Sequence, residues 1–130
     1  MSDLAHLKIW RDPAIRDGLS WYLDVAENRR PAKFRIAATL ATQVDPVESS
    51  EDALWAELDR LTPIFLRRWQ AIRTGAPLQD MAEGPSLLEL CRELAYRMLA
   101  HCNFCPWNCR VDRSAGAQFG ACRDRAPPRT

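Results

Sequence analysis

The sequence from Ser86 to Ala100, SLLELCRELAYRMLA, predicts the best-defined helix of the chain. Ser86 and Glu89 have the spacing of a capping box, in which a hydroxyl and a carboxylate each satisfy a backbone N–H group at the helix start. Apolar side chains then recur every three or four residues, which is the period of one helix face. This face is expected to pack on a core, and it contains Leu87, Leu90, Cys91, Leu94, Ala95, Met98 and Leu99.

Two helices are predicted near the N-terminus. Asp12 as the N-cap and Pro13 at the first helical position open the first helix, which ends at residues 28–31 (NRRP). Pro31 then opens a second helix that extends through Ala41, although the threonines in its C-terminal part are poor helix formers. Both segments have apolar residues at helical spacing and are therefore expected to contribute to a helical bundle.

A third helix is predicted from about Ser50 to about Thr74, with a kink or a division into two short helices at Pro63. Residues 75–85 are expected to form a loop, and no strand pattern precedes residue 102. The sequence thus predicts a mainly α fold, with a small helical bundle over residues 1–100. Four tryptophans are interpreted as packing residues of this bundle: Trp10, Trp21, Trp55 and Trp69.

Composition divides the chain near residue 100. The 130 residues are 47% hydrophobic and 27% charged with a net charge of +1, which is typical of a globular domain. Residues 1–100 contain thirteen basic and fifteen acidic side chains, whereas residues 101–130 contain five and two. We therefore expect two parts, a helical bundle over 1–100 and a cysteine-rich, metal-binding part over 101–130. No run of eighteen apolar residues and no export signal is present, so a cytoplasmic protein without a membrane partner is expected.

The C-terminal part contains four closely spaced cysteines in the stretch CNFCPWNCRVDRSAGAQFGAC. Their spacing is C-x2-C-x3-C-x12-C, and four thiolates complete a tetrahedral site for zinc or iron. Clustered thiols in a reducing compartment indicate metal binding more than disulfides. Gly116 and Gly120 are expected where the backbone turns sharply to return the last ligand. The sequence predicts an irregular four-cysteine knuckle with the metal ligands Cys102, Cys105, Cys109 and Cys122.

Neighbouring residues are given structural roles. Cys91 lies about 16 Å along a helix from Cys102, too far to share a site, and is expected to be a buried core thiol. His101 is expected to be an exposed residue at the helix end. The basic surplus is too small to predict a nucleic-acid site. Four arginines are interpreted as charge partners of the metal and as surface residues: Arg110, Arg113, Arg123 and Arg125.

The cysteine stretch closely resembles the segment C-x-x-C-P-x-x-C-x-V-[DN]-R-x-x-G-x-x-G-x-C near the N-terminus of radical SAM proteins of the pyruvate formate-lyase activating enzyme-like group. The resemblance spans residues 102–122, with one extra residue between the two glycines. It implies an iron–sulfur cluster of the 4Fe-4S type at these cysteines. Matching positions are Cys102, Cys105, Pro106, Cys109, Val111, Asp112, Arg113, Gly116, Gly120 and Cys122.

In that family the catalytic cluster is held by a later C-x3-C-x2-C motif on a barrel, where S-adenosylmethionine is cleaved to a radical. This chain has no such motif, because Asp112 stands where Cys105-x3-Cys109 would need a third cysteine. The resemblance implies the N-terminal portion of a radical SAM protein that is not catalytically competent alone. S-adenosylmethionine would bind only in a longer protein, and the implied partner is the missing barrel or its protein substrate.

A zinc-stabilised interaction domain, which would bind protein or nucleic acid, is the alternative. Zinc supplies about 10 to 16 kcal/mol to small zinc peptides, enough to order a segment that lacks its own core. An independent hydrolase or transferase is not expected, since His6 and His101 are the only imidazoles. The chain also has no phosphate loop, H-E-x-x-H motif or nucleophile elbow. No catalytic residue is therefore predicted.

Overall fold

The computed structural model describes residues 8–115 and 120–122. In this part of the chain the fold is mainly helical and contains no strand, apart from an isolated antiparallel bridge between Ala41 and Ser86. The predicted mainly α fold class is confirmed. The elements are the 3-10 helix η2 (Lys8–Arg11) and the helices α1 (Pro13–Gly18), α2 (Ser20–Ala26), α3 (Lys33–Ala37), α4 (Glu51–Arg73) and α5 (Leu87–Leu99).

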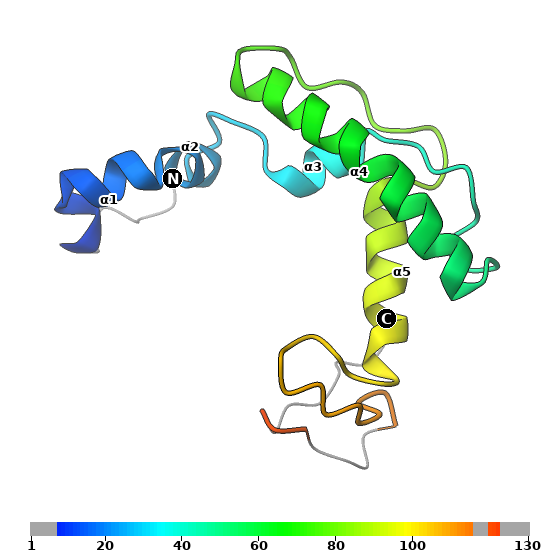
Figure 1. Cartoon of the computed structure of the whole chain (residues 1–130). Coiled ribbons are helices and arrows are strands. Elements are labelled where there is room, and N and C mark those ends of the chain that lie inside the picture. Colours follow the sequence, from blue (N-terminus) through cyan, green and yellow to red (C-terminus); the bar gives the residue numbers. More distant parts are fainter. Residues whose placement is uncertain (1–7, 116–119, 123–130) are drawn as a thin grey trace.

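The helices α3, α4 and α5 form the helical body of the molecule. Figure 1 shows α4 running across the N-terminal end of α5, with α3 beside both helices. Their apolar faces meet because each helix has one stripe of side chains that can leave water only by packing on another element. The buried cluster between them consists of Ala37, Leu40, Leu54, Leu61, Leu87, Leu90 and Leu94.

The start of α5 is fixed by local capping and by the preceding chain. The Glu89 carboxylate accepts a hydrogen bond from the Ser86 backbone N–H at 2.9 Å, which confirms the capping box. The Leu87 N–H donates to the Leu40 carbonyl at 2.8 Å, so the segment after α3 is attached to the first turn of α5. Cys91 is exposed, and the prediction that it is a buried core thiol is wrong. It lies at the edge of the apolar stripe.

Pro63 lies inside α4, which is a single helix of 23 residues. The alternative of two short helices is therefore wrong. Pro63 and Asp59 are both exposed, so water can replace the hydrogen bond that the proline cannot donate to the carbonyl four residues earlier. The Ser50 hydroxyl caps the helix start by accepting from the Ala53 N–H at 3.2 Å.

The N-terminal region forms two short helices where the sequence predicts one. Asp12 caps α1 as expected, since its carboxylate accepts from the Ala14 N–H at 2.9 Å. The helix is interrupted at Leu19, directly after Gly18, a residue with weak helix propensity. No residue described in η2, α1 or α2 is buried, and Figure 1 shows this region extending away from the helical body. The core of the bundle is therefore built by α3, α4 and α5.

The tryptophans contact one another and cations at the surface of the core. Trp21 and Trp69 meet edge to face with ring centroids 6.5 Å apart, which connects α2 to α4. Lys33 lies over the Trp69 ring at 4.1 Å, a favourable cation–π contact. Trp55 is exposed, and none of the four tryptophans is buried. Three of the tryptophans pack against other side chains or cations, as the sequence predicts for packing residues, but none of the four belongs to the buried core.

One buried carboxylate attaches the loop after α3 to α4. Glu57 is 5% exposed, and its Oε1 accepts from the Gln43 N–H at 2.7 Å and from the Thr42 hydroxyl at 3.2 Å. Arg60 donates to both carboxylate oxygens at 2.7 Å. The Arg60 hydrogen bond is the largest of the effects that lower the pKa of Glu57 to about 2. Among the described helices, none is long and apolar enough to cross a bilayer.

Candidate metal centre

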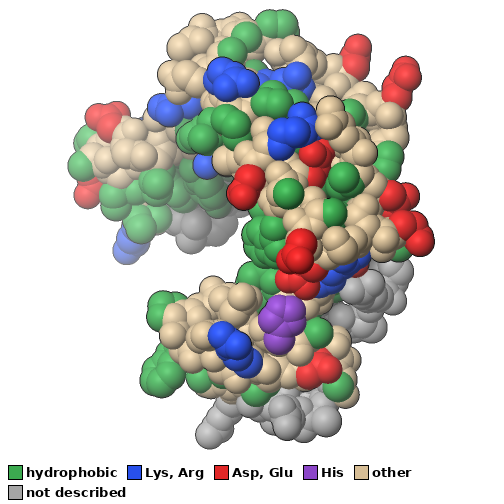
Figure 2. All heavy atoms as spheres, turned by 45° about the vertical axis from the view of Figure 1, so that its right-hand side comes forward, with side chains coloured by type: hydrophobic (Ala, Val, Ile, Leu, Met, Phe, Trp, Pro, Cys, Tyr) green, Lys and Arg blue, Asp and Glu red, His purple; other side chains and the backbone are tan. Residues whose placement is uncertain are grey.

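Residues 101–122 form the cysteine segment, and its described part begins where α5 ends. The chain turns back on the helix, because the Arg113 N–H donates to the Leu99 carbonyl at 2.8 Å. Cys102 is paired with the returning chain on both backbone groups. Its N–H donates to the Val111 carbonyl at 3.1 Å, and its carbonyl accepts from the Arg110 N–H at 2.9 Å. Figure 2 shows this part as a lobe below the rest of the molecule, joined to it on one side and separated from it by an open space on the other.

A tight turn separates the second and third cysteines. The Asn108 N–H donates to the Cys105 carbonyl at 3.0 Å, and Asn108 and Arg110 have φ values of 42° and 52°. Asparagine adopts this left-handed region more readily than most residues, which suits it to the turn. The turn places Cys105 and Cys109 on the same side of the segment, where both line one cavity.

Three cysteines border this cavity, and the fourth is buried next to one of them. Cys105, Cys109 and Cys122 line a cavity of about 260 Å3 together with Trp107, Arg113 and Ala121. Cys102 is only 3% exposed, and its thiol is within hydrogen-bonding reach of the Cys109 thiol. The structure thus brings the four predicted ligands to the same end of α5.

The Arg113 side chain lies among these sulfur atoms and is 6% exposed. Its Nη2 donates to Cys122 Sγ at 2.7 Å, and a second hydrogen bond connects it to Cys102. Both sulfur partners raise the pKa of the guanidinium above its usual value, with the Cys102 contact contributing most. Arg113 therefore remains a cation under all ordinary conditions.

The surroundings of the Cys109 thiol lower its pKa. Hydrogen bonds from the backbone of Ala121 and then of Val111 lower its pKa, and the Cys102 thiol and the Arg113 charge add to this effect. Partial burial acts in the opposite direction. A lower thiol pKa favours the thiolate, which is the form that binds metal.

Gly120 is the point of closest backbone approach to the site. A methyl group on its Cα would collide with the Arg113 guanidinium and would lie 2.9 Å from Cys109 Sγ. The glycine is therefore needed for space beside two side chains of the site. The sequence suggested a sharp turn as its role. Gly116, Arg123 and Arg125, to which the sequence also gives roles, lie outside the described residues, as does His6.

The described cysteines do not yet form a coordination shell. Within residues 8–115 and 120–122, no three His, Cys, Asp or Glu side chains are arranged so that they could hold a metal ion. The predicted four-cysteine knuckle is therefore not present as a formed site. His101 is exposed, with its Nε2 3.9 Å from a Glu51 carboxylate oxygen, as expected for a residue at the helix end.

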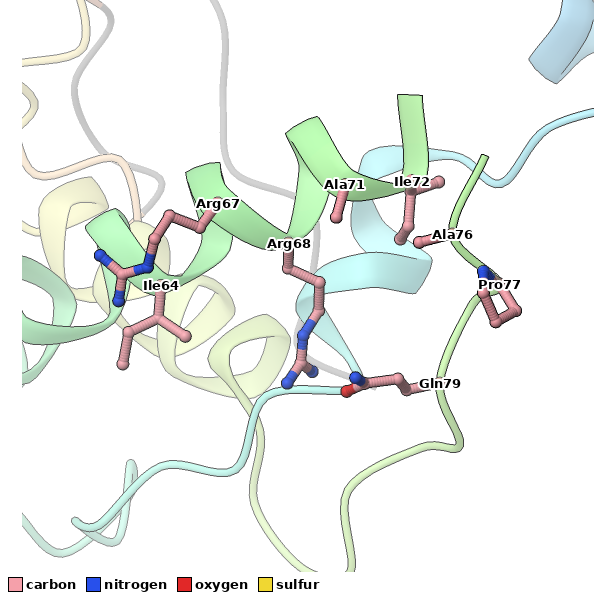
Figure 3. Close-up of a pocket in the computed structure, with 8 residues that line it drawn as sticks. All are labelled: Ile64, Arg67, Arg68, Ala71, Ile72, Ala76, Pro77 and Gln79. Carbon is pink, nitrogen blue, oxygen red and sulfur yellow. The ribbon is translucent and has the colours of Figure 1, made fainter. Parts of the chain in front are cut away.

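Two other cavities have fewer side chains that could bind a metal or a polar ligand. Figure 3 shows a cavity of about 290 Å3 between α4 and the following loop, into which Arg68 extends. The Arg68 guanidinium is already bonded to the Thr39 carbonyl at 2.9 Å and to the Thr39 hydroxyl at 2.7 Å. A cavity of about 250 Å3 between α3, α4 and α5 is almost entirely apolar and includes Cys91. The cysteine segment is therefore the best candidate site.

Comparisons of the chain with protein-family models, with curated proteins and with solved structures found no match. The resemblance of residues 102–122 to radical SAM proteins therefore stays a prediction. Sequence reasoning did not single out Arg113 from the three other arginines near the cysteines. The signal that separates it is its burial among sulfur atoms, which depends on the fold.

Proposed function

We propose that the cysteine segment binds a thiolate-ligated metal centre, with a 4Fe-4S cluster as the favoured occupant, in the N-terminal portion of a radical SAM protein. The proposed ligands are Cys102, Cys105, Cys109 and Cys122. The observation that supports this most directly is the common cavity bordered by three of these cysteines, with the fourth in contact with Cys109.

The donor set and the available space both fit such a centre. Four sulfur donors are the usual ligands of iron–sulfur clusters and of structural zinc. The cavity volume of about 260 Å3 is several times the roughly 30 Å3 that one water molecule takes up in the liquid. Since the thiols border the cavity without forming a coordination shell, binding requires them to rotate inward.

The chain's own residues would hold and shield the centre. The backbone pairing of Cys102 with Val111 and Arg110 fixes the first ligand at the end of α5, and the turn at Asn108 fixes the next two. A bound cluster would supply one-electron transfer, and bound zinc would supply a structural cross-link. The chain lacks the C-x3-C-x2-C motif, so no radical chemistry and no S-adenosylmethionine site are assigned to it.

The test is anaerobic reconstitution of the chain with iron and sulfide, in parallel with zinc loading of a second sample. We expect the wild type to retain iron and sulfide through gel filtration, with broad visible absorbance. Cys109→Ser should lose this retention, because it removes the ligand that contacts Cys102 and the cavity. Cys91→Ser is the matched control on α5, and it should retain the wild-type iron content.

These measurements test metal binding and the choice of ligands separately. A wild type that retains neither iron nor zinc would contradict the proposed function. Equal metal loss in the Cys91 and Cys109 variants would contradict the ligand assignment. The link to radical SAM chemistry is tested separately in the gene. A C-x3-C-x2-C motif in the reading frame shortly downstream of residue 130 would support a partner barrel, and a stop codon there would contradict it.

A zinc-stabilised interaction domain is the second candidate, and one observation favours it. In the described part of the cysteine segment, only Cys102, Arg113 and Gly120 are buried. A segment with so few buried residues needs a cross-link to become rigid, and a structural zinc ion provides one. Retention of a single zinc ion per chain in place of iron, with colourless protein, would support this candidate.

A further inference from the structure

We propose that Arg113 is a positioning residue of the metal centre, as the hydrogen-bond donor and counter-charge to its sulfur ligands. This inference rests on the proposed function, because it assigns a role to Arg113 toward the same centre. Of the two arginines described in the cysteine segment, Arg113 is buried among sulfurs, whereas Arg110 is exposed and contributes its backbone N–H to the Cys102 carbonyl.

The position of Arg113 is set by its backbone on both sides. Its N–H is bonded to the Leu99 carbonyl in the last turn of α5, at 2.8 Å. The preceding residue, Asp112, caps the following turn by accepting from the Ser114 N–H at 2.8 Å and from the Ala115 N–H at 3.1 Å. The guanidinium therefore extends from a fixed point on the helix end toward the cysteines that border the cavity.

The partners of the guanidinium are the proposed ligands themselves. Nη2 donates to Cys122 Sγ at 2.7 Å, a further hydrogen bond reaches Cys102, and the positive charge acts on Cys109. Cys105 lines the same cavity as the guanidinium. Gly120 completes the enclosure, because any side chain at this position would displace the guanidinium.

The positive charge of Arg113 would offset the negative charge of a thiolate-ligated centre. A buried cation is costly unless anionic groups surround it. Four thiolates around Zn2+ or around an oxidised 4Fe-4S core carry a net charge of −2, which a single arginine reduces to −1. N–H groups that donate to ligand sulfurs also set the reduction potential of iron–sulfur clusters. Arg113 is thus placed to stabilise the centre and to make the cluster easier to reduce.

The experiment compares wild type, Arg113→Gln, Arg113→Lys and Arg110→Gln after loading with iron and sulfide, or with zinc if the wild type retains only zinc. We measure the rate of metal release to a chelator and, for a cluster, its midpoint potential. Arg113→Gln should release metal about 10 to 100 times faster, the usual effect of losing an outer hydrogen-bond partner of a metal site. Its midpoint potential should fall, because a positive charge and a hydrogen bond to sulfur are lost.

The other variants sharpen the assignment. Arg110→Gln should behave as wild type, because Arg110 contributes only its backbone N–H to the site and glutamine keeps that group. Arg113→Lys should release metal more slowly than Arg113→Gln because it keeps the charge. Unchanged release and potential in Arg113→Gln would overturn the role of Arg113 while leaving the metal site intact. Equal effects in both glutamine variants would overturn it as well. If Arg113→Gln loses its helical circular dichroism, Gly120→Ala takes its place, because a methyl group at this position displaces the guanidinium. Wild-type metal release in Gly120→Ala would then overturn the proposal.

A wild type that holds no metal would instead overturn the proposed function, and the role of Arg113 with it. The two failures are therefore distinguishable in the same set of samples.

Discussion

The helical body and the cysteine segment are stabilised by different interactions. In α3, α4 and α5 the buried residues are almost all aliphatic, and side chains such as Leu54 and Leu90 are completely covered. In the described cysteine segment the buried groups are a thiol, a guanidinium and a glycine, joined by hydrogen bonds to sulfur. The body can therefore fold by burying apolar surface, whereas the described part of the segment is held by hydrogen bonds to sulfur and by charge.

The largest loss of stability is expected when part of the core of the helical body is removed. Leu90→Ala should lower the free energy of unfolding by about 3 kcal/mol, because Leu90 is completely buried in the cluster between α4 and α5. Urea denaturation followed by helical circular dichroism measures the change. Leu66→Ala is the control on α4, since Leu66 is 50% exposed and should cost less than about 0.5 kcal/mol. Equal losses would contradict the assigned core.

A smaller effect is expected at the buried carboxylate of the body. Glu57→Gln should cost about 2 kcal/mol at neutral pH, because it removes a charged acceptor of hydrogen bonds from Arg60, Gln43 and Thr42. The fold lowers the pKa of Glu57 from 4.5 to about 2. Its ionised form therefore stabilises the fold above pH 4.5, and this contribution is lost as the pH falls from 4.5 through about 2.

The measurement is the free energy of unfolding of wild type and Glu57→Gln as a function of pH. The difference between the two should shrink over that acid range. Glu48→Gln is a suitable control, since Glu48 is exposed on the loop before α4. A difference that stays constant down to pH 2 would contradict the proposed contribution of the Glu57 carboxylate.

The smallest change in the free energy of unfolding is expected for a substitution in the cysteine segment. Its effect should instead appear in the reactivity of nearby thiols. Gly120→Ala should change the unfolding of the body by less than about 0.5 kcal/mol, because Gly120 lies outside the aliphatic core. It should nevertheless raise the reactivity of Cys109 and Cys122 toward a thiol reagent, since the new methyl group displaces Arg113. Gly18→Ala is the control, because a methyl group there meets no atom within 4 Å. Thiol reactivity equal to wild type would contradict the close approach at Gly120.

The parts of the fold that local sequence determines are those that were predicted. Ser86 and Glu89 define the start of α5, and Asp12 with Pro13 defines the start of α1, because capping involves residues within one turn. The length of α4 was also approximately predicted. The predicted division of this helix at Pro63 was wrong, since an exposed proline leaves its lost hydrogen bond to water.

Features that depend on distant partners were not predictable from the sequence. The four tryptophans have the spacing of core residues, yet none is buried, because burial depends on which other elements pack against each ring. Cys91 belongs to the apolar stripe by its period, yet it is exposed and lines the cavity between α3, α4 and α5. Within the site, the spacing pointed to four cysteines, but only the return of the chain onto Leu99 distinguishes Arg113 from its neighbours.

Backbone hydrogen bonds at its two ends make α5 a rigid connection between the loop after α3 and the cysteine segment. Leu87 is bonded to the Leu40 carbonyl at one end, and the Leu99 carbonyl is bonded to Arg113 at the other. Thirteen helical residues span about 20 Å and bend little. A displacement of the cysteine segment at one end of α5 would therefore also move the loop that follows α3 at the other end.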